Sequence, residues 1–147
     1  MKEGLKLRGD VIIESRRKDG SVVERQELKN LIVNVGKERV AKLINGVSST
    51  AMSVIGIGIG TTSPSASDTD LETEVSKASA SVSYEAGYKA VFEKTFTFGS
   101  GISYNITEAG VFDAIGSGGT MLDRFTFTAK AVDSDTDLYI KVTITVS

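Results

Sequence analysis

The chain contains no cysteine, no histidine and no tryptophan, and its 147 residues include a single proline. Because it has no cysteine, the sequence excludes a disulfide framework, a thiolate metal site and a cysteine nucleophile. Because it has no histidine, it also lacks the commonest general base and the commonest metal ligand of proteins. These absences remove most hydrolase and metalloenzyme sites. We therefore predict that the protein is not an enzyme, has no catalytic residues, needs no cofactor and holds no metal.

Long apolar runs are also missing. No stretch approaches the roughly 20 apolar residues that span a bilayer, and the first ten residues, MKEGLKLRGD, lack the apolar core of a signal peptide. We therefore expect no membrane association, and a protein made in a cytosol or in a particle assembled there. Hydrophobic residues make up 40% of the chain and charged residues 24%, which is typical of a single folded domain, predicted here over residues 1–147.

The charges are unevenly distributed along the chain. Residues 1–47 hold eleven Lys/Arg and seven Asp/Glu, whereas the remainder holds six and twelve, so that the net charge is −2. A basic end on an acidic body can orient a molecule on an acidic partner surface or on the acidic end of a neighbouring copy. The alternative is a solvated surface without a partner. The basic residues are not interleaved with aromatic ones, so we expect no nucleic-acid binding.

Apolar residues alternate with polar ones along most of the sequence, and this period of two predicts strands. A hairpin is expected within residues 1–30, with its first strand carrying Leu5 to Ile13, a turn of the Asp-Gly type at residues 18–21 and a return over residues 22–28. We expect this hairpin to project as a partner-binding element. Further strands are predicted around residues 88–98, 102–106, 121–131 and 138–146, with residues 121, 125, 127, 129 and 131 on one face.

One stretch changes to a helical period. Val40, Leu43, Ile44 and Val47 follow the i, i+3, i+4, i+7 spacing of an apolar helix face, and Asn34 is a candidate N-cap. The pair at residues 45–46, Asn-Gly, is a typical helix stop. The fold class predicted is therefore mainly β, an antiparallel β-sandwich or barrel, with one main helix near residues 35–45.

Isoleucine and glycine alternate over residues 55–60, at the start of the segment 52–70. A strand with this pattern has one β-branched face and one bare face that another group can approach closely. We expect the phenylalanines of residues 92–98 and 125–127 to cover the bare face, and a subunit contact is the alternative. The spacing G-x-G-x-G lies within a strand and lacks the third glycine of the dinucleotide-binding fingerprint.

Two acidic clusters are candidates for binding or capping. Residues 133–137, DSDTD, resemble the start of an EF-hand loop, but Leu138 and Ile144 stand where that loop needs glycine and glutamate. We expect a solvated turn there, with a weak calcium site as the alternative. The four acidic residues between 68 and 74 have the spacing of a helix N-terminus. We therefore expect a short helical turn, capped by residue 67 or 68, with Leu71, Val75 and Ala78 on one face.

Two sequence blocks carry a resemblance to a known family. The first is GIGTT at residues 58–62, followed by Pro64, Ala66, Asp68-Thr69, Leu71 and Glu74; the second is ITEAGVFD at residues 106–113, followed by MLDR at residues 121–124. Together they cover about a third of the chain, and the pair resembles small virion proteins of tailed bacteriophages. Such proteins are described as head decoration (auxiliary capsid) proteins or as tail-fibre-like proteins.

This resemblance implies a capsid decoration protein that binds the major capsid protein on the outer face of the shell and forms homotrimers. It places the protein in the virion, assembled in the host cytoplasm. We expect the basic hairpin and the loop 61–70 to make the intersubunit or capsid contacts, through Arg8, Arg16, Arg17, Lys18, Thr61, Thr62, Pro64 and Asp68. One alternative is a tail fibre or tail-tip subunit that contacts the host surface, with glycan binding through Tyr84, Tyr88 or Tyr104. A second alternative is a carbohydrate-binding β-sandwich module.

Overall fold

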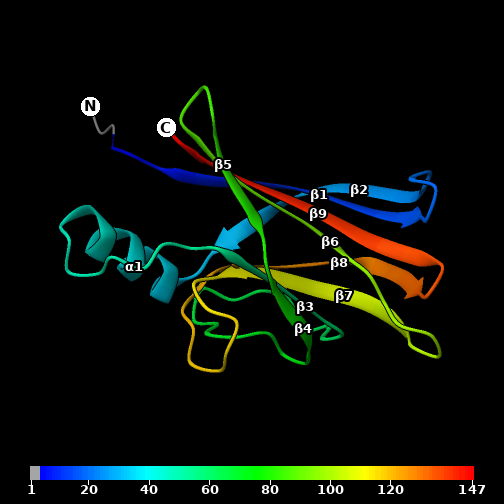
Figure 1. The fold of residues 1–147 in the computed structure, drawn as a ribbon. Coiled ribbons are helices and arrows are strands. Elements are labelled where there is room, and N and C mark those ends of the chain that lie inside the picture. Colours follow the sequence, from blue (N-terminus) through cyan, green and yellow to red (C-terminus); the bar gives the residue numbers. More distant parts are fainter. Residues whose placement is uncertain (1–3) are drawn as a thin grey trace.

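The computed structural model describes residues 4–147, and these form two facing layers of antiparallel strands with a helix at one end (Figure 1). Our expectations about residues 1–3, at the start of the predicted hairpin, lie outside this described part. The elements are β1 (Leu7–Arg17), β2 (Val22–Ile32), α1 (Asn34–Ile44), β3 (Val54–Gly58), β4 (Glu74–Ser79), β5 (Ser81–Glu85), β6 (Lys89–Phe96), β7 (Ser103–Phe112), β8 (Met121–Asp133) and β9 (Thr136–Val146). The prediction of a mainly β fold with one short helix is confirmed.

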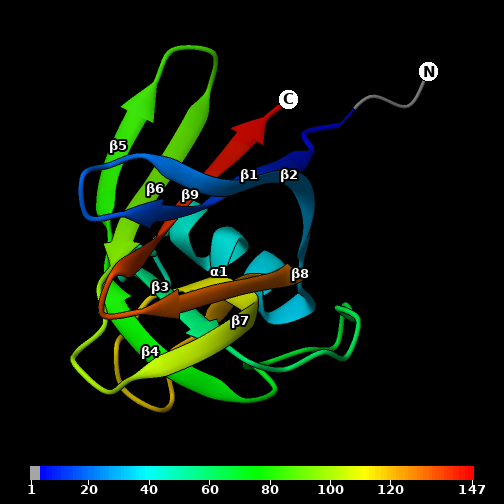
Figure 2. The same ribbon diagram turned by 90° about the vertical axis from the view of Figure 1, so that its right-hand side faces the viewer.

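The strands form one nine-stranded sheet that folds over on itself, in the order β4-β3-β7-β8-β2-β1-β9-β6-β5. We call β4, β3, β7 and β8 the lower layer and the other five strands the upper layer, as they lie in Figure 1. The layers are joined through only two β2–β8 residue pairs, at Leu31 and Ile32. They are joined again at the β8–β9 turn, and Ala80 links the edge strands β4 and β5. Figure 2 shows the enclosed interior from the end opposite α1.

The hairpin predicted near the N-terminus is a central part of the upper layer. β1 pairs with β2 on one side and with β9 on the other, where the register runs from Leu7↔Val146 to Arg17↔Thr136. The turn between β1 and β2 contains Gly20 in the left-handed region, at φ 89°. The strands at both ends of the chain therefore hold each other in place at the middle of one layer.

The main hydrophobic core lies between the layers. It is built by alternate residues of the facing strands, among them Val11, Ile13, Ile55, Ile57, Phe92, Phe96, Phe125, Phe127, Leu138, Ile140 and Val142. The alternation in β9 is as predicted from Leu138 to Ile144. In β6, Phe92 and Phe96 are buried as predicted, whereas the placement of Ala90 inward and Val91 outward is wrong, since Ala90 is exposed and Val91 is buried. The phenylalanines of residues 92–98 and 125–127 pack on the isoleucine face of β3, so the expectation that they cover its glycine face is wrong.

The glycine face of β3 points away from the main core and is covered by the chain's own groups. A Cβ at Gly56 would lie 2.9 Å from the ring of Phe112 and 3.2 Å from Leu71. The Lys77 ammonium lies 4.0 Å from the centre of the Phe112 ring. Phe112 and Leu71 belong to a second buried cluster with Val33, Val54 and Met121. β3 is therefore covered on both faces.

Helix α1 packs less deeply than its sequence predicts. Its one fully buried residue is Gly36, whose Cα sits against the backbone of Leu122 on β8 so closely that a Cβ would collide with it. Ile44 and Val47 are exposed, so the predicted apolar face is wrong in part, because the helix turns its Gly36 side to the sheet. The predicted N-cap is also wrong: Val33 occupies that position and makes no side-chain capping bond. The stop at Asn45-Gly46 is confirmed, with Gly46 at φ 78°.

Two further local predictions are wrong for physical reasons. The β7–β8 register shifts between Ile106↔Lys130 and Glu108↔Thr126, which reverses the faces of β8. Lys130 and Val132 are therefore buried, whereas residues 129 and 131, predicted to face inward, are exposed. No helical turn forms at residues 68–74: the segment is a loop that leads into β4, because Glu108 binds its backbone.

Candidate interaction surface

The loop that connects β3 to β4, residues 59–73, is held against the lower layer by one buried carboxylate. Glu108 on β7 is 0% exposed. Its oxygens accept hydrogen bonds from the backbone N–H groups of Gly60 (2.7 Å), Glu72 (2.8 Å) and Thr73 (2.8 Å). These donors come from both ends of the loop, so a single side chain fixes where the loop leaves the sheet and where it returns.

A buried arginine completes this anchor. Arg124 on β8 is 2% exposed; its Nε donates to Glu108 (3.1 Å) and its Nη1 donates to Asp68 (3.1 Å). Gly110 lies opposite Arg124 in the β7–β8 register. Arg124 therefore connects the middle of the loop to the carboxylate that holds both of its ends. We call Glu108, Arg124 and Asp68 the loop anchor.

The loop is also satisfied by its own side chains. The Glu72 carboxylate accepts the N–H groups of Thr61 (2.7 Å) and Thr62 (2.9 Å) and the Thr62 hydroxyl (2.5 Å). These hydrogen bonds, above all the one from the Thr62 hydroxyl, lower the pKa of Glu72. The backbone carbonyl of Ala66 accepts the N–H of Asn34, which ties the loop to the start of α1. Apart from the buried Leu71, the side chains of the loop are exposed or half-buried, whereas its backbone is held by these hydrogen bonds.

The structure separates the eight predicted interface residues into two groups. Thr61, Thr62, Pro64 and Asp68 lie on the anchored loop, with Asp68 engaged by Arg124. The basic residues lie in the upper layer, on β1 and in the turn that follows it (Figure 1). Each of them except Arg17 has a charged partner: Arg8 pairs with Asp10, Arg16 with Glu14, and Lys18 with Asp137.

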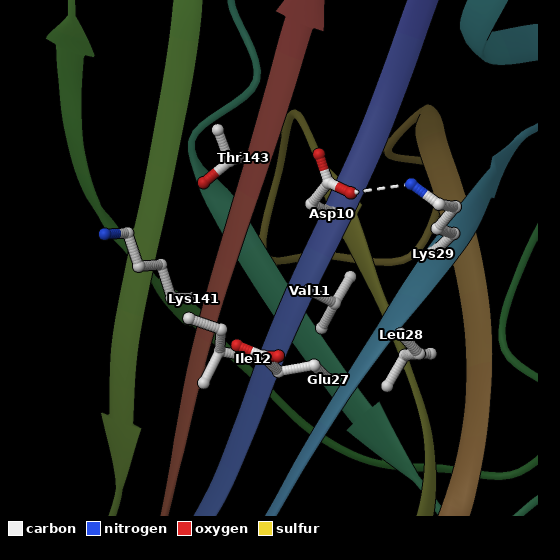
Figure 3. Close-up of a pocket in the computed structure, with 8 residues that line it drawn as sticks. All are labelled: Asp10, Val11, Ile12, Glu27, Leu28, Lys29, Lys141 and Thr143. Carbon is white, nitrogen blue, oxygen red and sulfur yellow. Dashed lines mark hydrogen bonds and ion pairs between the residues drawn. The ribbon is translucent and has the colours of Figure 1, made fainter.

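The outer face of β2, β1 and β9 forms a hollow lined by side chains of both charge signs (Figure 3). Lys29 donates to Asp10 across the strands at 3.2 Å, and Glu27 and Lys141 lie on either side of Ile12. Farther along β9, Tyr139 donates to Glu93 at 2.5 Å, and burial with this hydrogen bond raises the pKa of Tyr139 to about 12. The hollow is lined by two acidic and two basic side chains, of which Lys29 and Asp10 pair with each other and Glu27 pairs with Arg25.

A titratable group lies where the two layers join. Asp123 is buried, accepts the Val111 N–H at 2.8 Å and is bonded by the Asn30 amide. Burial raises the pKa of Asp123 to about 7, and the two hydrogen bonds oppose that rise. The side-chain amide oxygen of Asn30, Oδ1, is buried and has no hydrogen-bond partner among the described residues.

An apolar surface at one end of the molecule was missed by the sequence analysis. It combines Leu5 (83% exposed), Tyr84 (71%), Tyr88 (72%) and Val146, and it continues through Leu5 and Val146 into a groove beside Val40 and Ile44 of α1. The lysines that line it are Lys6, Lys37 and Lys89. We call this set the terminal-end surface, because both ends of the described chain lie there (Figure 1). From the sequence, a contact role was predicted only for its tyrosines, Tyr84 and Tyr88, as glycan contacts of a tail protein.

A smaller groove lies at the opposite end, beside the β6–β7 and β8–β9 turns (Figure 1). It is lined by Ile59, Ser103, Tyr104, Asn105, Ala131, Val132 and Asp133. Ile59 and Tyr104 are partly exposed, and Asp135 follows at the exposed turn. We call this set the turn-end groove.

Within residues 4–147, no group of three or more potential metal ligands comes together, the acidic turn 133–137 included. In the same residues, no helix has the length and apolar character needed to cross a membrane. The chain matches no protein-family model, no curated protein and no solved structure.

Proposed function

We propose that the protein is a non-enzymatic structural component of a tailed-phage virion, namely a capsid decoration protein. In this proposal it binds the outer face of the shell formed by the major capsid protein, as a homo-oligomer, and stabilises that shell. The anchored loop at residues 59–73 and the basic side chains of β1 are the contact elements. The protein acts by fitting against other proteins and performs no chemistry on a substrate.

One observation carries this proposal: the two sequence blocks that resemble virion proteins meet in a single structural unit. Gly60 and Asp68 of the first block are bound by Glu108 and Arg124 of the second, and Glu108 and Arg124 bind each other. The residues that carry the resemblance therefore include those that hold the loop in a fixed shape. A loop that is fixed before binding loses little conformational entropy on binding, which favours a rigid contact with a repeating surface.

The experiment is a binding assay with empty capsid shells of the phage that encodes the protein. Purified protein is incubated with shells before and after expansion, the shells are sedimented, and bound copies are counted; cryo-electron microscopy then locates them. We expect saturable binding to expanded shells and a higher shell melting temperature. An Asp68→Ala/Thr62→Ala variant is expected to bind more weakly. Absence of binding to expanded shells would contradict the proposal.

A second candidate is a tail component that contacts the host surface, and the exposed rings of Tyr84 and Tyr88 favour it. Exposed aromatic rings are suited to stacking on sugars. Binding to a glycan array, lost in Tyr84→Ala and Tyr88→Ala variants, together with density at the tail in micrographs of the virion, would support this candidate. Glycan binding by a protein that is absent from the virion would instead identify a carbohydrate-binding module.

A further inference from the structure

The terminal-end surface leaves Leu5, Tyr84 and Tyr88 exposed side by side. Tyr88 is the one non-glycine residue among residues 4–147 with a positive φ, 67°, a conformation in which a bulky side chain is strained. Its backbone carbonyl accepts the Val146 N–H at 3.0 Å, a bond that any residue there would make. Neither the positive φ at position 88 nor the hydrogen bond from Val146 requires a tyrosine ring. The exposed ring therefore indicates contact with a partner.

The two ends of the molecule carry opposite charges around apolar surfaces. Lys6, Lys37 and Lys89 line the terminal-end surface, and Asp133 with the adjacent Asp135 borders the turn-end groove. At the turn end, Lys18 is neutralised by its pair with Asp137. At the terminal end, Lys89 pairs with Glu85 at 3.4 Å, whereas no ion pair involves Lys6 or Lys37 among the described residues. Arg17, which also lies at the turn end beside Thr136, has no ion-pair partner among the described residues, but Asp19, Asp133 and Asp135 outnumber it. The net charge is thus basic at one end and acidic at the other.

We propose that copies of this chain associate head to tail, with the terminal-end surface of one copy seated on the turn-end groove of the next. Leu5, Tyr84 and Tyr88 cover Ile59 and Tyr104 of the neighbour, and Lys6 and Lys37 face its Asp133 and Asp135. Such a contact joins two different patches, so it produces a ring if the rotation between copies closes and an open chain if it does not. This inference rests on the oligomeric assembly of the proposed function and specifies which surfaces form it.

Charge reversal at the two ends tests the proposal. The first variant is Lys6→Glu/Lys37→Glu and the second is Asp133→Lys/Asp135→Lys; all four positions are exposed. By sedimentation equilibrium at low salt, we expect the wild type to associate and each variant alone to associate at least tenfold more weakly. An equimolar mixture of the two variants regains association, because the first variant then has two acidic ends and the second has two basic ends, so that every contact between them joins opposite charges. The fourfold variant associates with itself and does not join the wild type.

Tyr88→Gly is a second test that leaves all charges unchanged. Because glycine adopts a positive φ without strain, the melting temperature of the variant is expected to equal or exceed that of the wild type, while association weakens. Ile115→Ser, an exposed apolar position outside both surfaces, is the matched control and keeps wild-type association. Circular dichroism confirms that each variant is folded.

Three outcomes would overturn the proposal: a wild type that remains monomeric at millimolar concentration, reversed variants that associate normally, or a mixture that does not regain association. The proposed function is judged separately by shell binding. If the protein associates head to tail in solution but does not bind shells, the head-to-tail inference stands and the decoration function is wrong. If it is a monomer that binds shells, the decoration function stands and the head-to-tail inference is wrong.

Discussion

At the scale of single residues, the loop anchor contains a fully buried ion pair between Glu108 and Arg124. Glu108 and Arg124 are both buried, and the Glu108 carboxylate also accepts three backbone N–H groups. Removing one partner of a buried ion pair leaves the other charge without compensation, which costs more than the pair itself contributes. The pair is therefore a sensitive position for substitution.

We expect Glu108→Gln to lower the free energy of unfolding by about 3–5 kcal/mol, because Arg124 loses its buried counter-charge and the amide presents N–H groups to N–H donors. Urea denaturation measures this loss, and limited proteolysis reports cleavage within residues 59–73. Glu72→Gln, at an exposed carboxylate of the same loop, is the control and has a smaller effect. Equal losses in the two variants would show that the loop anchor has no special role.

The buried Asp123 gives stability a defined dependence on pH. Its pKa is raised to about 7 in the folded chain and is about 3.9 when the chain is unfolded. Between these values the folded state binds a proton that the unfolded state releases. The contribution of Asp123 to stability is therefore complete below pH 4, falls as the pH rises to about 7, and does not change above it.

We expect the difference in unfolding free energy between wild type and Asp123→Asn to shift against the wild type by up to about 1.4 kcal/mol per pH unit between pH 4 and 7. The asparagine carbonyl still accepts the Val111 N–H, so the variant folds. Urea denaturation at pH values from 4 to 9 measures the difference. Parallel curves for the two proteins would contradict the raised pKa.

At the scale of elements, the separation of β2 from β8 is bridged by side chains. Beyond the β2–β8 pairs at Leu31 and Ile32, Gln26 on β2 reaches across: its Oε1 accepts the N–H of Thr128 at 3.1 Å and the ammonium of Lys130 at 2.9 Å. Burial lowers the pKa of Lys130, and Glu24 opposes this change. Gln26 thus connects the two layers through side-chain hydrogen bonds in the region where β2 and β8 no longer pair through their backbones.

We expect Gln26→Leu to lower the unfolding free energy by about 1–3 kcal/mol, because the Lys130 ammonium and the Thr128 N–H each lose an acceptor. Gln26→Glu, of nearly the same shape, keeps both hydrogen bonds, adds an opposite charge and raises the pKa of Lys130. Denaturation of both variants, with the Lys130 titration followed by NMR, checks the pair of expectations. If leucine were tolerated as well as glutamate, the bridge would contribute nothing.

Sequence periodicity predicts the elements well where one face of a strand is buried without interruption. β9 keeps the alternation from Leu138 to Ile144 as expected. In β6, Phe92 and Phe96 point inward as expected, but Val91 is buried as well and Ala90 is exposed. In β8 the alternation continues in the sequence but reverses in the structure, because residues between Thr126 and Lys130 bulge out of the β7 pairing. Such a shift depends on the neighbouring strand, so the sequence of β8 alone does not contain it.

The loop anchor has a recognisable sequence pattern, a charged residue within an apolar strand, in addition to the resemblance that its two blocks carry. Glu108 stands in ITEAGVF and Arg124 in MLDRFTF, so both charges interrupt apolar strands. Charged residues in such positions are rarely buried unless they are paired. That they pair with each other and with the loop 59–73 depends on the β7–β8 register, which sequence spacing does not give. The terminal-end surface was missed because its residues come from Leu5, β5–β6, β9 and α1 and meet only after folding.

At the scale of the whole molecule, the two ends of the chain are folded against each other. β1 pairs with β9 along its whole length, and β9 in turn pairs with β6. Forming this layer requires closure of loops nearly as long as the chain, and folding is slow when contacts are far apart in sequence. We therefore expect refolding on a time scale of roughly milliseconds to seconds.

Stopped-flow refolding from urea, followed by tyrosine fluorescence, measures this rate. Deletion of residues 138–147 removes most of β9 and is expected to leave the chain unfolded, since β1 and β6 then lose their shared partner. A deletion variant that keeps a cooperative unfolding transition would show that the lower layer and α1 are stable alone.

The position of the loop anchor has a consequence for how the sequence can diversify. The loop anchor attaches at Gly60, Asp68, Glu72 and Thr73, and the Ser65 N–H donates to Asp68 at 2.9 Å, while Ser63 is exposed. Position 63 can therefore change its side chain without disturbing the hydrogen bonds of the loop anchor. Foreign peptides grafted at this position would be displayed on a scaffold that stays the same.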